Sequence, residues 1–245
     1  FDPLFEEKQI RFYIKREDLT DYFISGNKFY KLKYNLIEAE KLGFKTLLTF
    51  GGAYSNHIHA TAAAGKKYGF NTIGVIRGEE HLPLNPTLSS AQENGMLIEY
   101  IDRKSYRNKY DESLLQTLKE KFGDFYLIPE GGSNYLAIKG CAEIISSIKI
   151  DFNFICSACG TGGTLAGLIL GLDSKHFALG FSVLKGGSFL YQNVRNLLSY
   201  YQKENLNNFQ INLDYHFGGY AKTKMELNSF CTRFTEQHNI QIEPI

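Results

Sequence analysis

A glycine-rich segment in the second half of the chain has the composition of a phosphate-binding loop. It runs from Ser157 to Thr164 (SACGTGGT), between an apolar run typical of a strand and an Ala/Gly/Leu-rich helical pattern. Glycines let backbone amides crowd around an anion, and a helix N-terminus adds unpaired donors and a partial positive charge. The residues predicted to hold a phosphate group are Gly160, Thr161, Gly162, Gly163 and Thr164. A tight turn without a ligand is the alternative.

The surroundings of this loop narrow the kind of phosphate ligand. The loop is not a Walker A motif, because no lysine follows its glycines. A dinucleotide site would need an Asp or Glu near the end of the next strand to hold the ribose. The next predicted strand ends at Gly180–Val183 without an acid. A single phosphate group is therefore favoured over a nicotinamide cofactor, and a nicotinamide oxidoreductase is the second choice.

A lysine pair near the N-terminus could supply Schiff-base chemistry. Gly26 and Asn27 form a predicted turn, and the helical pattern after it places Lys28 and Lys31 one turn apart on one face. A lysine desolvated by a neighbouring aromatic ring has a lowered pKa, which makes its amine nucleophilic at neutral pH. Lys28, which precedes Phe29, is the candidate; a solvated surface lysine is the alternative.

A second strand–glycine–helix junction runs from Phe50 to His57 (FGGAYSNH). Ser55 or Asn56 can cap the helix that follows, and the free amides of its first turn can bind a carboxylate. Plain capping without a ligand is the alternative. His57 and His59 suggest a metal site, but residues two apart on a helix point in different directions, so no metal is expected.

Cysteine content and charge balance bear on the other classes of protein. Cys156 and Cys159 form a C-x-x-C pair, but no second pair completes a zinc set, so packed free thiols in a reducing cytoplasm are predicted. A net charge of +1 gives no electrostatic footprint for nucleic acid. No apolar run approaches the roughly 20 residues that span a bilayer, and the first residues lack the features of a signal peptide.

Short apolar strands alternate with longer helical patterns, which predicts an α/β fold of right-handed βαβ units and mainly parallel sheets. The predicted strands are 46–50, 72–76, 97–100, 125–128, 153–156, 178–183 and 210–215. The predicted helices are 56–68, 86–94, 104–122, 135–148, 163–170, 190–202 and 222–238. Glycines at 51–52 and 131–132 follow strand ends, where open α/β sheets bind their ligands. The stretch 129–133 is the predicted boundary between two α/β units.

Together and in order, these segments resemble the 1-aminocyclopropane-1-carboxylate (ACC) deaminase and D-cysteine desulfhydrase family of fold-type II pyridoxal-phosphate (PLP) enzymes. The matching segments are 15–20 (KREDLT), 25–28 (SGNK), 51–57 (GGAYSNH), 129–134 (PEGGSN), 160–164 (GTGGT) and 217–220 (FGGY). The resemblance implies two open, mainly parallel α/β domains with the cofactor between them. The large domain would comprise residues 1–34 and 134–245, and the smaller one residues 35–133.

The resemblance implies a cofactor site. Lys28 would bind PLP as a Schiff base and later move the substrate proton. Lys31 would help the loop of Gly160, Thr161, Gly162, Gly163 and Thr164 to neutralise the phosphate group. Asn56 would hydrogen-bond to the phenolic oxygen of PLP.

The resemblance also implies a substrate site next to the cofactor. Ser55, Asn56 and His57 would receive the substrate carboxylate at the start of their helix. Tyr220 would lie over the substrate as an acid, base or positioning group, and Ser55 is a further catalytic candidate. The expected partners are a small amino-acid substrate and a second copy of the chain in a homodimer, with neither nucleic acid nor membrane.

The implied function is a deaminase or carbon–sulfur lyase that releases ammonia and a 2-oxo acid. With D-cysteine, Lys28 would take the α-proton and pyruvate would form; ACC has no α-proton and would yield 2-oxobutanoate. ACC deaminases have Ser-Asn-Gln where this chain has Ser55-Asn56-His57, the form closer to the desulfhydrases. The family pattern continues beyond Ile245 with a tyrosine and a residue that faces the pyridine nitrogen. A non-catalytic homologue that binds PLP or an amino acid is the alternative.

Overall fold

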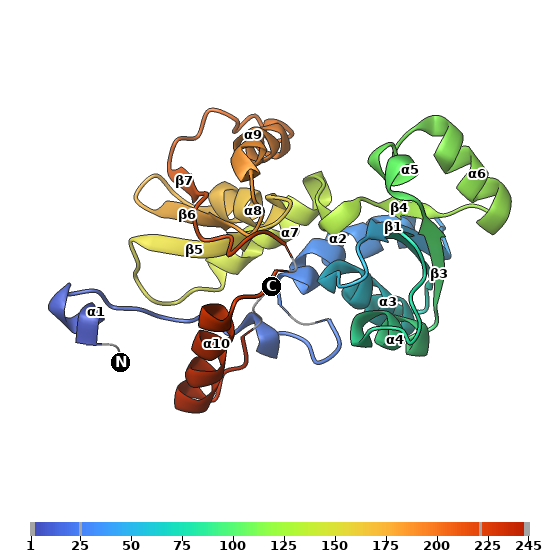
Figure 1. The fold of residues 1–245 in the computed structure, drawn as a ribbon. Coiled ribbons are helices and arrows are strands. Elements are labelled where there is room, and N and C mark those ends of the chain that lie inside the picture. The colour runs from blue at the N-terminus through green and yellow to red at the C-terminus, as the bar shows by residue number, and fades with distance from the viewer. Residues whose placement is uncertain (1–2, 25, 221, 243–245) are drawn as a thin grey trace.

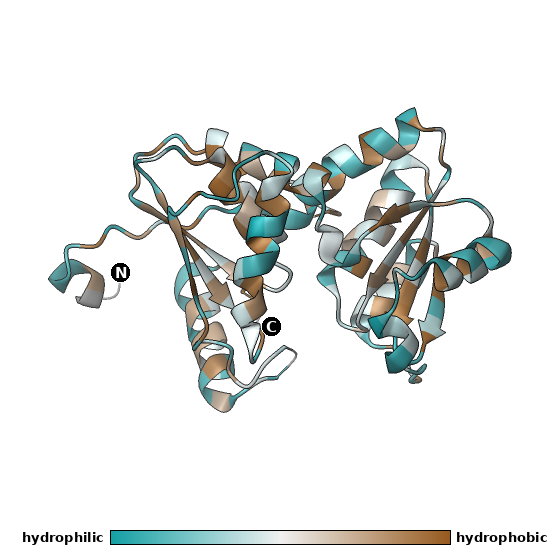
Figure 2. Ribbon diagram, turned by 90° about the horizontal axis from the view of Figure 1, so that it is seen from above, coloured by the Kyte–Doolittle hydropathy of each residue, from teal (hydrophilic) through white to brown (hydrophobic). Residues whose placement is uncertain are grey.

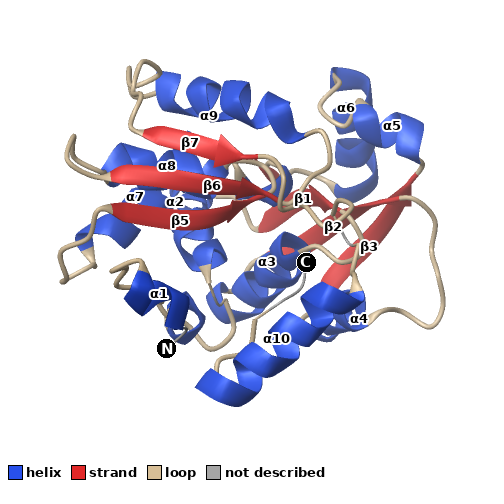
Figure 3. Ribbon diagram, turned by 60° about the vertical axis from the view of Figure 1, so that its left-hand side comes forward, coloured by secondary structure: helices blue, strands red, loops and turns tan. Residues whose placement is uncertain are grey.

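Two parallel β-sheets, each flanked by helices, make up the computed structural model, which describes residues 3–24, 26–220 and 222–242 (Figure 3). The first sheet has the order β3-β2-β1-β4, with strands β1 (Thr46–Gly51), β2 (Asn71–Arg77), β3 (Met96–Ile101) and β4 (Tyr126–Ile128). The second sheet has the order β5-β6-β7, with strands β5 (Phe154–Cys159), β6 (Phe177–Ser182) and β7 (Phe209–Asn212). Every strand pairing is parallel, which confirms the predicted α/β class.

Most of the helices connect the strands and flank the two sheets, whereas α1 (Pro3–Glu7) lies on an N-terminal segment apart from both sheets (Figure 1). The described helices are α1, α2 (Asn27–Lys41), α3 (Asn56–Tyr68), α4 (Pro86–Glu93), α5 (Arg103–Arg107), α6 (Glu112–Phe122), α7 (Tyr135–Ser146), α8 (Gly163–Gly171), α9 (Leu190–Ser199) and α10 (Met225–His238). Three 3-10 turns join them: η1 (Glu17–Leu19), η2 (Glu130–Gly132) and η3 (Gly187–Phe189). No described helix combines the length and apolarity that crossing a membrane requires.

Burial on both faces explains why the central strands are continuous apolar runs. In β1, the five residues from Leu47 to Gly51 are buried, as parallel strands covered by helices on both faces require. Figure 2 shows the apolar residues along the strands of each half and the polar residues on the outer helices. In the second sheet, β5 alternates between burial and exposure, so Cys156 is exposed whereas Cys159 is buried.

Several predicted boundaries were wrong: the strand predicted at 210–215 ends at Asn212, the helix predicted from 222 begins at Met225, and two further differences have identifiable reasons. The predicted strand 153–156 continues to Cys159, because its pairing with β6 extends to Ser182, so the loop starts only at Gly160. The predicted helix 104–122 is two helices, α5 and α6. Asp111 is the N-cap of α6, and its amide bonds to the Asn108 carbonyl in the turn between them.

Helices α2, α7 and α8 approach one another closely because glycines face their neighbours. A Cβ atom at Gly140 of α7 would collide with the backbone carbonyl of Tyr30 in α2. A Cβ atom at Gly167 of α8 would collide with Cys141 of α7. This packing fixes α2, which precedes the first sheet in the chain, against the helices of the second sheet.

Gly140→Ala should lower the free energy of unfolding by about 1–3 kcal/mol, since an added methyl group in a packed interface forces the backbones apart. Urea denaturation followed by circular dichroism measures the change. Ser146→Ala, an exposed change on the same helix, is the control and should stay within about 0.5 kcal/mol of the parent protein. An unchanged midpoint for Gly140→Ala would show that α2 and α7 do not need this close approach.

Candidate active site

The first turn of α2 lies against the start of α8, although the two are far apart in the sequence. The Asn27 side-chain amide donates a hydrogen bond of 2.6 Å to the Thr164 hydroxyl. The Lys28 ammonium in turn donates to the Asn27 side-chain oxygen at 3.2 Å. These two hydrogen bonds bring Lys28, which is half-buried, next to the predicted phosphate loop. Ser25, the first residue of the predicted motif, lies outside the described residues.

The predicted phosphate loop follows β5 and leads directly into α8. Gly162 is the N-cap of α8 and has a left-handed backbone with φ of 83°, which favours glycine. The first amides of α8 have no partner within the helix, as at every helix N-terminus. The hydroxyls of Thr161 and Ser133 are 2.5 Å apart, so a second segment, the one after η2, joins the loop.

Lys31 lies beneath this loop and is 2% exposed. Its ammonium donates to the Gly131 carbonyl at 2.8 Å and to the Ser133 hydroxyl at 3.1 Å. An ideal Cβ atom on Gly163 would lie 3.0 Å from the same nitrogen, so the lysine touches the first residue of α8. Burial lowers the pKa of Lys31. The Gly131 carbonyl and the Ser133 hydroxyl stabilise this buried cation, and an anion bound in the loop would stabilise it further.

The start of α3 presents the second predicted anion site. Ser55 is the N-cap, and its hydroxyl accepts a hydrogen bond of 3.3 Å from the Ile58 amide. Asn56 and His57 form the first turn, whose amides have no acceptor within the helix. The Tyr220 hydroxyl donates to the Tyr54 carbonyl at 3.2 Å, which brings the 217–220 segment to this junction.

His57 has an environment that its sequence position did not reveal. Its side chain is 1% exposed and lies 2.9 Å from the Thr49 hydroxyl through Nε2. Burial, with Lys28 and Lys31 nearby, lowers the pKa of His57 well below its usual value, so the ring is neutral. His59 is only half-buried, and no cluster of potential metal ligands occurs among the described residues.

The carboxyl ends of strands from both sheets converge on these residues. Gly51 ends β1, η2 follows β4, and Gly160 follows β5, which is where parallel sheets place their ligands. Asn27, Thr49 and Ser133 belong to the same cluster, but sequence reasoning assigned them no role. Ser133 could have been noticed, because it lies in the glycine-rich turn 129–134. The hydrogen-bond partners of Asn27 and Thr49 can be identified only from the folded structure.

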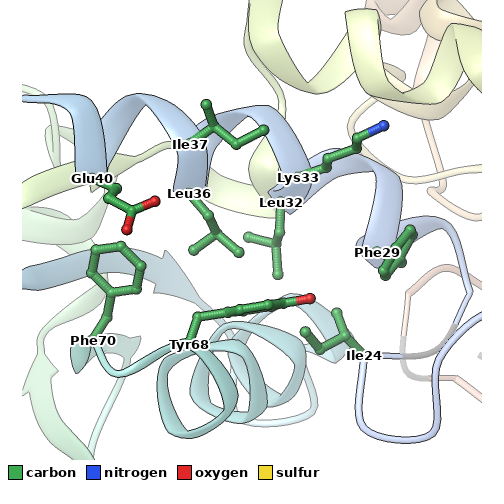
Figure 4. A pocket seen from close by; sticks show the side chains of 9 residues that line it. All are labelled: Ile24, Phe29, Leu32, Lys33, Leu36, Ile37, Glu40, Tyr68 and Phe70. Atoms are coloured by element: carbon green, nitrogen blue, oxygen red, sulfur yellow. The ribbon is translucent and has the colours of Figure 1, made fainter.

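One pocket described by the structure lies elsewhere, between α2 and the C-terminal end of α3 (Figure 4). Its lining is mostly apolar and consists of Ile24, Phe29, Leu32, Lys33, Leu36, Ile37, Glu40, Tyr68 and Phe70. None of the predicted site residues lines it. Lys33, at its edge, forms an ion pair of 2.6 Å with Glu143. This pocket therefore lacks the convergent polar groups that the loop cluster has.

Comparisons with known proteins agree with the loop cluster. A family model described as “Pyridoxal-phosphate dependent enzyme” matches residues 1–186. A protein of Pyrococcus horikoshii named “Putative 1-aminocyclopropane-1-carboxylate deaminase” is 32% identical over 247 residues, which cover 95% of this chain and 75% of the relative. The “Bifunctional D-cysteine desulfhydrase/1-aminocyclopropane-1-carboxylate deaminase, mitochondrial” of Arabidopsis thaliana is 31% identical over 257 residues, which cover 95% of this chain and 64% of the relative.

A solved structure supports the same assignment. The crystal structure of an ACC deaminase homologue superposes with a TM-score of 0.86 at 29% sequence identity, covering 99% of this chain and 78% of the other. Serine racemase from Dictyostelium discoideum, at 18% identity and a TM-score of 0.61, shares the fold alone. The chain belongs to the pyridoxal-phosphate dependent enzymes, within the ACC deaminase and D-cysteine desulfhydrase family, and PLP is its cofactor.

Proposed function

We propose that this enzyme converts a small amino acid into ammonia and a 2-oxo acid, as a deaminase or carbon–sulfur lyase with Lys28 as its cofactor-binding lysine. The observation that carries the proposal is the 2.6 Å hydrogen bond between Asn27 and Thr164, which fixes the start of α2 against the glycine loop. The names of the Pyrococcus and Arabidopsis relatives support a substrate of the ACC or D-cysteine type.

The residues of the loop cluster fit PLP. A phosphate group needs several N–H and O–H donors and a nearby cation. The first turn of α8, the hydroxyls of Thr161 and Ser133, and buried Lys31 supply all of these. Lys28, one residue from the Asn27 contact, supplies an amine for the aldehyde carbon. In this proposal Gly160, Thr161, Gly162, Gly163 and Thr164 hold the phosphate.

When bound, PLP supplies an electron-withdrawing ring that accepts the electron pair left at the substrate α-carbon. Lys28 would hold the cofactor covalently through its amine and would move the proton at the substrate α-carbon. Asn56 would donate from its side-chain amide to the phenolic oxygen of the cofactor. Lys31 stays in place beneath the loop because the Gly131 carbonyl and the Ser133 hydroxyl hold it.

The substrate carboxylate is assigned to the start of α3. The first-turn amides of Asn56 and His57 and the Ser55 hydroxyl can donate to it, with the positive end of the helix dipole adding attraction. We assign Tyr220, which is 39% exposed, a position over the substrate, because its hydroxyl contacts the Tyr54 carbonyl beside this site. Ser55 and Tyr220 are the candidates for an additional proton transfer or nucleophilic step.

Two further parts of the proposal rest on the family resemblance, a homodimer and the division into domains. The domains are proposed to be residues 1–34 with 134–245, and residues 35–133. The two sheets lie on either side of the boundary at 133 in the sequence, and α2, which the boundary after residue 34 divides, contacts helices of both halves. A cytoplasmic location is proposed from the cysteines, which form no disulfide scaffold.

Borohydride reduction of the PLP-loaded protein should leave a pyridoxyl group on Lys28, mapped by peptide mass spectrometry. Lys28→Ala should lose this label and reduce turnover by about a thousandfold or more, since no other group forms the covalent bond. Lys33→Ala, on the same helix and paired with Glu143, is the matched control and should keep the label. A label on another lysine would move the site, and a labelled protein without turnover would favour the non-catalytic alternative.

Thr161→Ala should raise the dissociation constant for PLP by about tenfold, the effect of losing one hydrogen bond to a charged group. Thr161→Ser keeps the hydroxyl that contacts Ser133 and should retain most of the affinity. Absorbance titration with PLP measures both variants. Equal affinities for the Ala and Ser variants would contradict the phosphate assignment of this hydroxyl.

Product analysis should distinguish the two substrate classes. D-cysteine should release pyruvate with hydrosulfide, whereas ACC should release 2-oxobutanoate, and lactate dehydrogenase-coupled assays followed by chromatography separate these acids. His57 in place of glutamine predicts a higher kcat/KM for D-cysteine than for ACC. A higher value for ACC would reverse the assignment.

A further inference from the structure

The His57 ring is enclosed between strand β1 and turn η2. Nε2 lies 2.9 Å from the Thr49 hydroxyl of β1. An ideal Cβ atom on Gly132 would lie 3.0 Å from Cε1 and 3.3 Å from Nδ1, so that edge of the ring faces η2. Nδ1 is buried and has no hydrogen-bond partner among the described residues. A buried nitrogen without a hydrogen-bond partner is rare in native proteins and calls for an explanation.

The hydrogen bonds of Thr49 determine which ring nitrogen carries the proton. The Thr49 hydroxyl has one proton, and it donates that proton to the Ile128 carbonyl at 2.8 Å. Toward His57 the same oxygen can therefore only accept, so Nε2 carries the hydrogen. Burial and the two nearby lysines lower the pKa of His57 and keep the ring neutral. Nδ1 is consequently a bare lone pair.

A bare lone pair restricts what Nδ1 can bind. It cannot hold the substrate carboxylate, which also offers only acceptors, so His57 can contribute only its backbone amide to that task. Nδ1 needs a donor. The ideal Cβ position on Gly132, 3.3 Å from Nδ1, lies 3.5 Å from the Cβ atom of Lys31, and Lys28 lies one turn earlier on the same helix, so both lysines are near this edge of the ring. Lys31 is held in place by the Gly131 carbonyl and the Ser133 hydroxyl, and in that position its ammonium makes no hydrogen bond to Nδ1. Lys28 is the lysine whose nitrogen is released during the proposed reaction.

We propose that His57 is a positioning residue for Lys28, held by Thr49 in the Nε2-protonated tautomer so that Nδ1 accepts a hydrogen bond from the released Lys28 ammonium. This inference rests on the proposed function. The Lys28 amine takes the substrate α-proton, the C–H bond breaks, and its electron pair stays with the substrate. Nδ1 steadies the resulting ammonium without taking a proton from it. The device therefore serves substrates that carry an α-proton.

The tautomer can be tested without any turnover. Side-chain ¹⁵N NMR of the PLP-free protein at pH 7, with the His57 signals assigned through their loss in His57→Gln, should show a protonated Nε2 and a bare Nδ1. Thr49→Val removes the acceptor for Nε2–H and should shift the tautomer population, whereas Thr49→Ser should restore it. A protonated Nδ1 in the parent protein would overturn the proposal.

The effect on Lys28 is measured as exchange of the substrate α-proton with deuterated solvent, using D-cysteine or D-serine and proton NMR. The amide of Asn can place an acceptor near the position of Nδ1, whereas the amide of Gln reaches the position of Nε2. His57→Gln and Thr49→Val should slow exchange by about ten- to a hundredfold, the effect of losing a hydrogen bond to a charged group. Exchange should be faster in His57→Asn than in His57→Gln, and faster in Thr49→Ser than in Thr49→Val.

Retention of the Lys28 pyridoxyl label in all four variants serves as the control for folding and cofactor loading. Exchange rates equal to that of the parent protein in His57→Gln and Thr49→Val would show that His57 is only part of the core, and would overturn the inference. A parent protein with neither exchange nor turnover of any amino acid would instead remove the proposed function on which the inference rests. The two failures are therefore distinguishable.

Discussion

The close approach of α2, α7 and α8 is the constraint on which the site depends. Glycines at 140 and 167 let the three helices pack backbone against backbone. This contact places the first turn of α2 beside the first turn of α8, where Asn27 meets Thr164. If the helices were separated by the width of one side chain, Lys28 and the glycine loop would no longer share a site. The packing of these helices thus determines how close Lys28 lies to the glycine loop.

The candidate site also contains a buried charge, that of Lys31, next to a half-buried lysine and a neutral histidine. Lys31 is buried beneath the loop, Lys28 is half-buried beside it, and His57 remains neutral in the presence of both. The hydroxyl and carbonyl groups of η2 and its neighbour Ser133 stabilise Lys31. Hydrogen bonds therefore fix the position of the buried cation, and an anionic cofactor bound at this loop would be attracted by its positive charge.

Much of this arrangement could be predicted from local sequence, and the reasons for the remainder are physical. The parallel strands follow from apolar runs between helical patterns, and the loop at Gly160 follows from glycine and threonine between a strand and a helix. The division between α5 and α6 was missed because the Asp111 cap lies within an otherwise helical charge pattern. The roles of Asn27 and Thr49 were missed because their partners, Thr164 and Ile128, are distant in the sequence. Residues whose function depends on a long-range contact carry no local signal.

The packing of α2 against α7 has a consequence for how the chain emerges from the ribosome. Helix α2 ends at Lys41, but the helix it packs against ends at Ser146, so the Lys28 segment leaves the exit tunnel long before its partner. At a synthesis rate of about 5–20 residues per second, the wait is roughly 5–20 s. During that time Tyr30 of α2 lacks Cys141 and Ile144 of α7, with which it forms a buried cluster. The first turn of α2, which carries the candidate lysine Lys28, is thus synthesised early, whereas the α7 residues that complete the packing of this helix are synthesised much later.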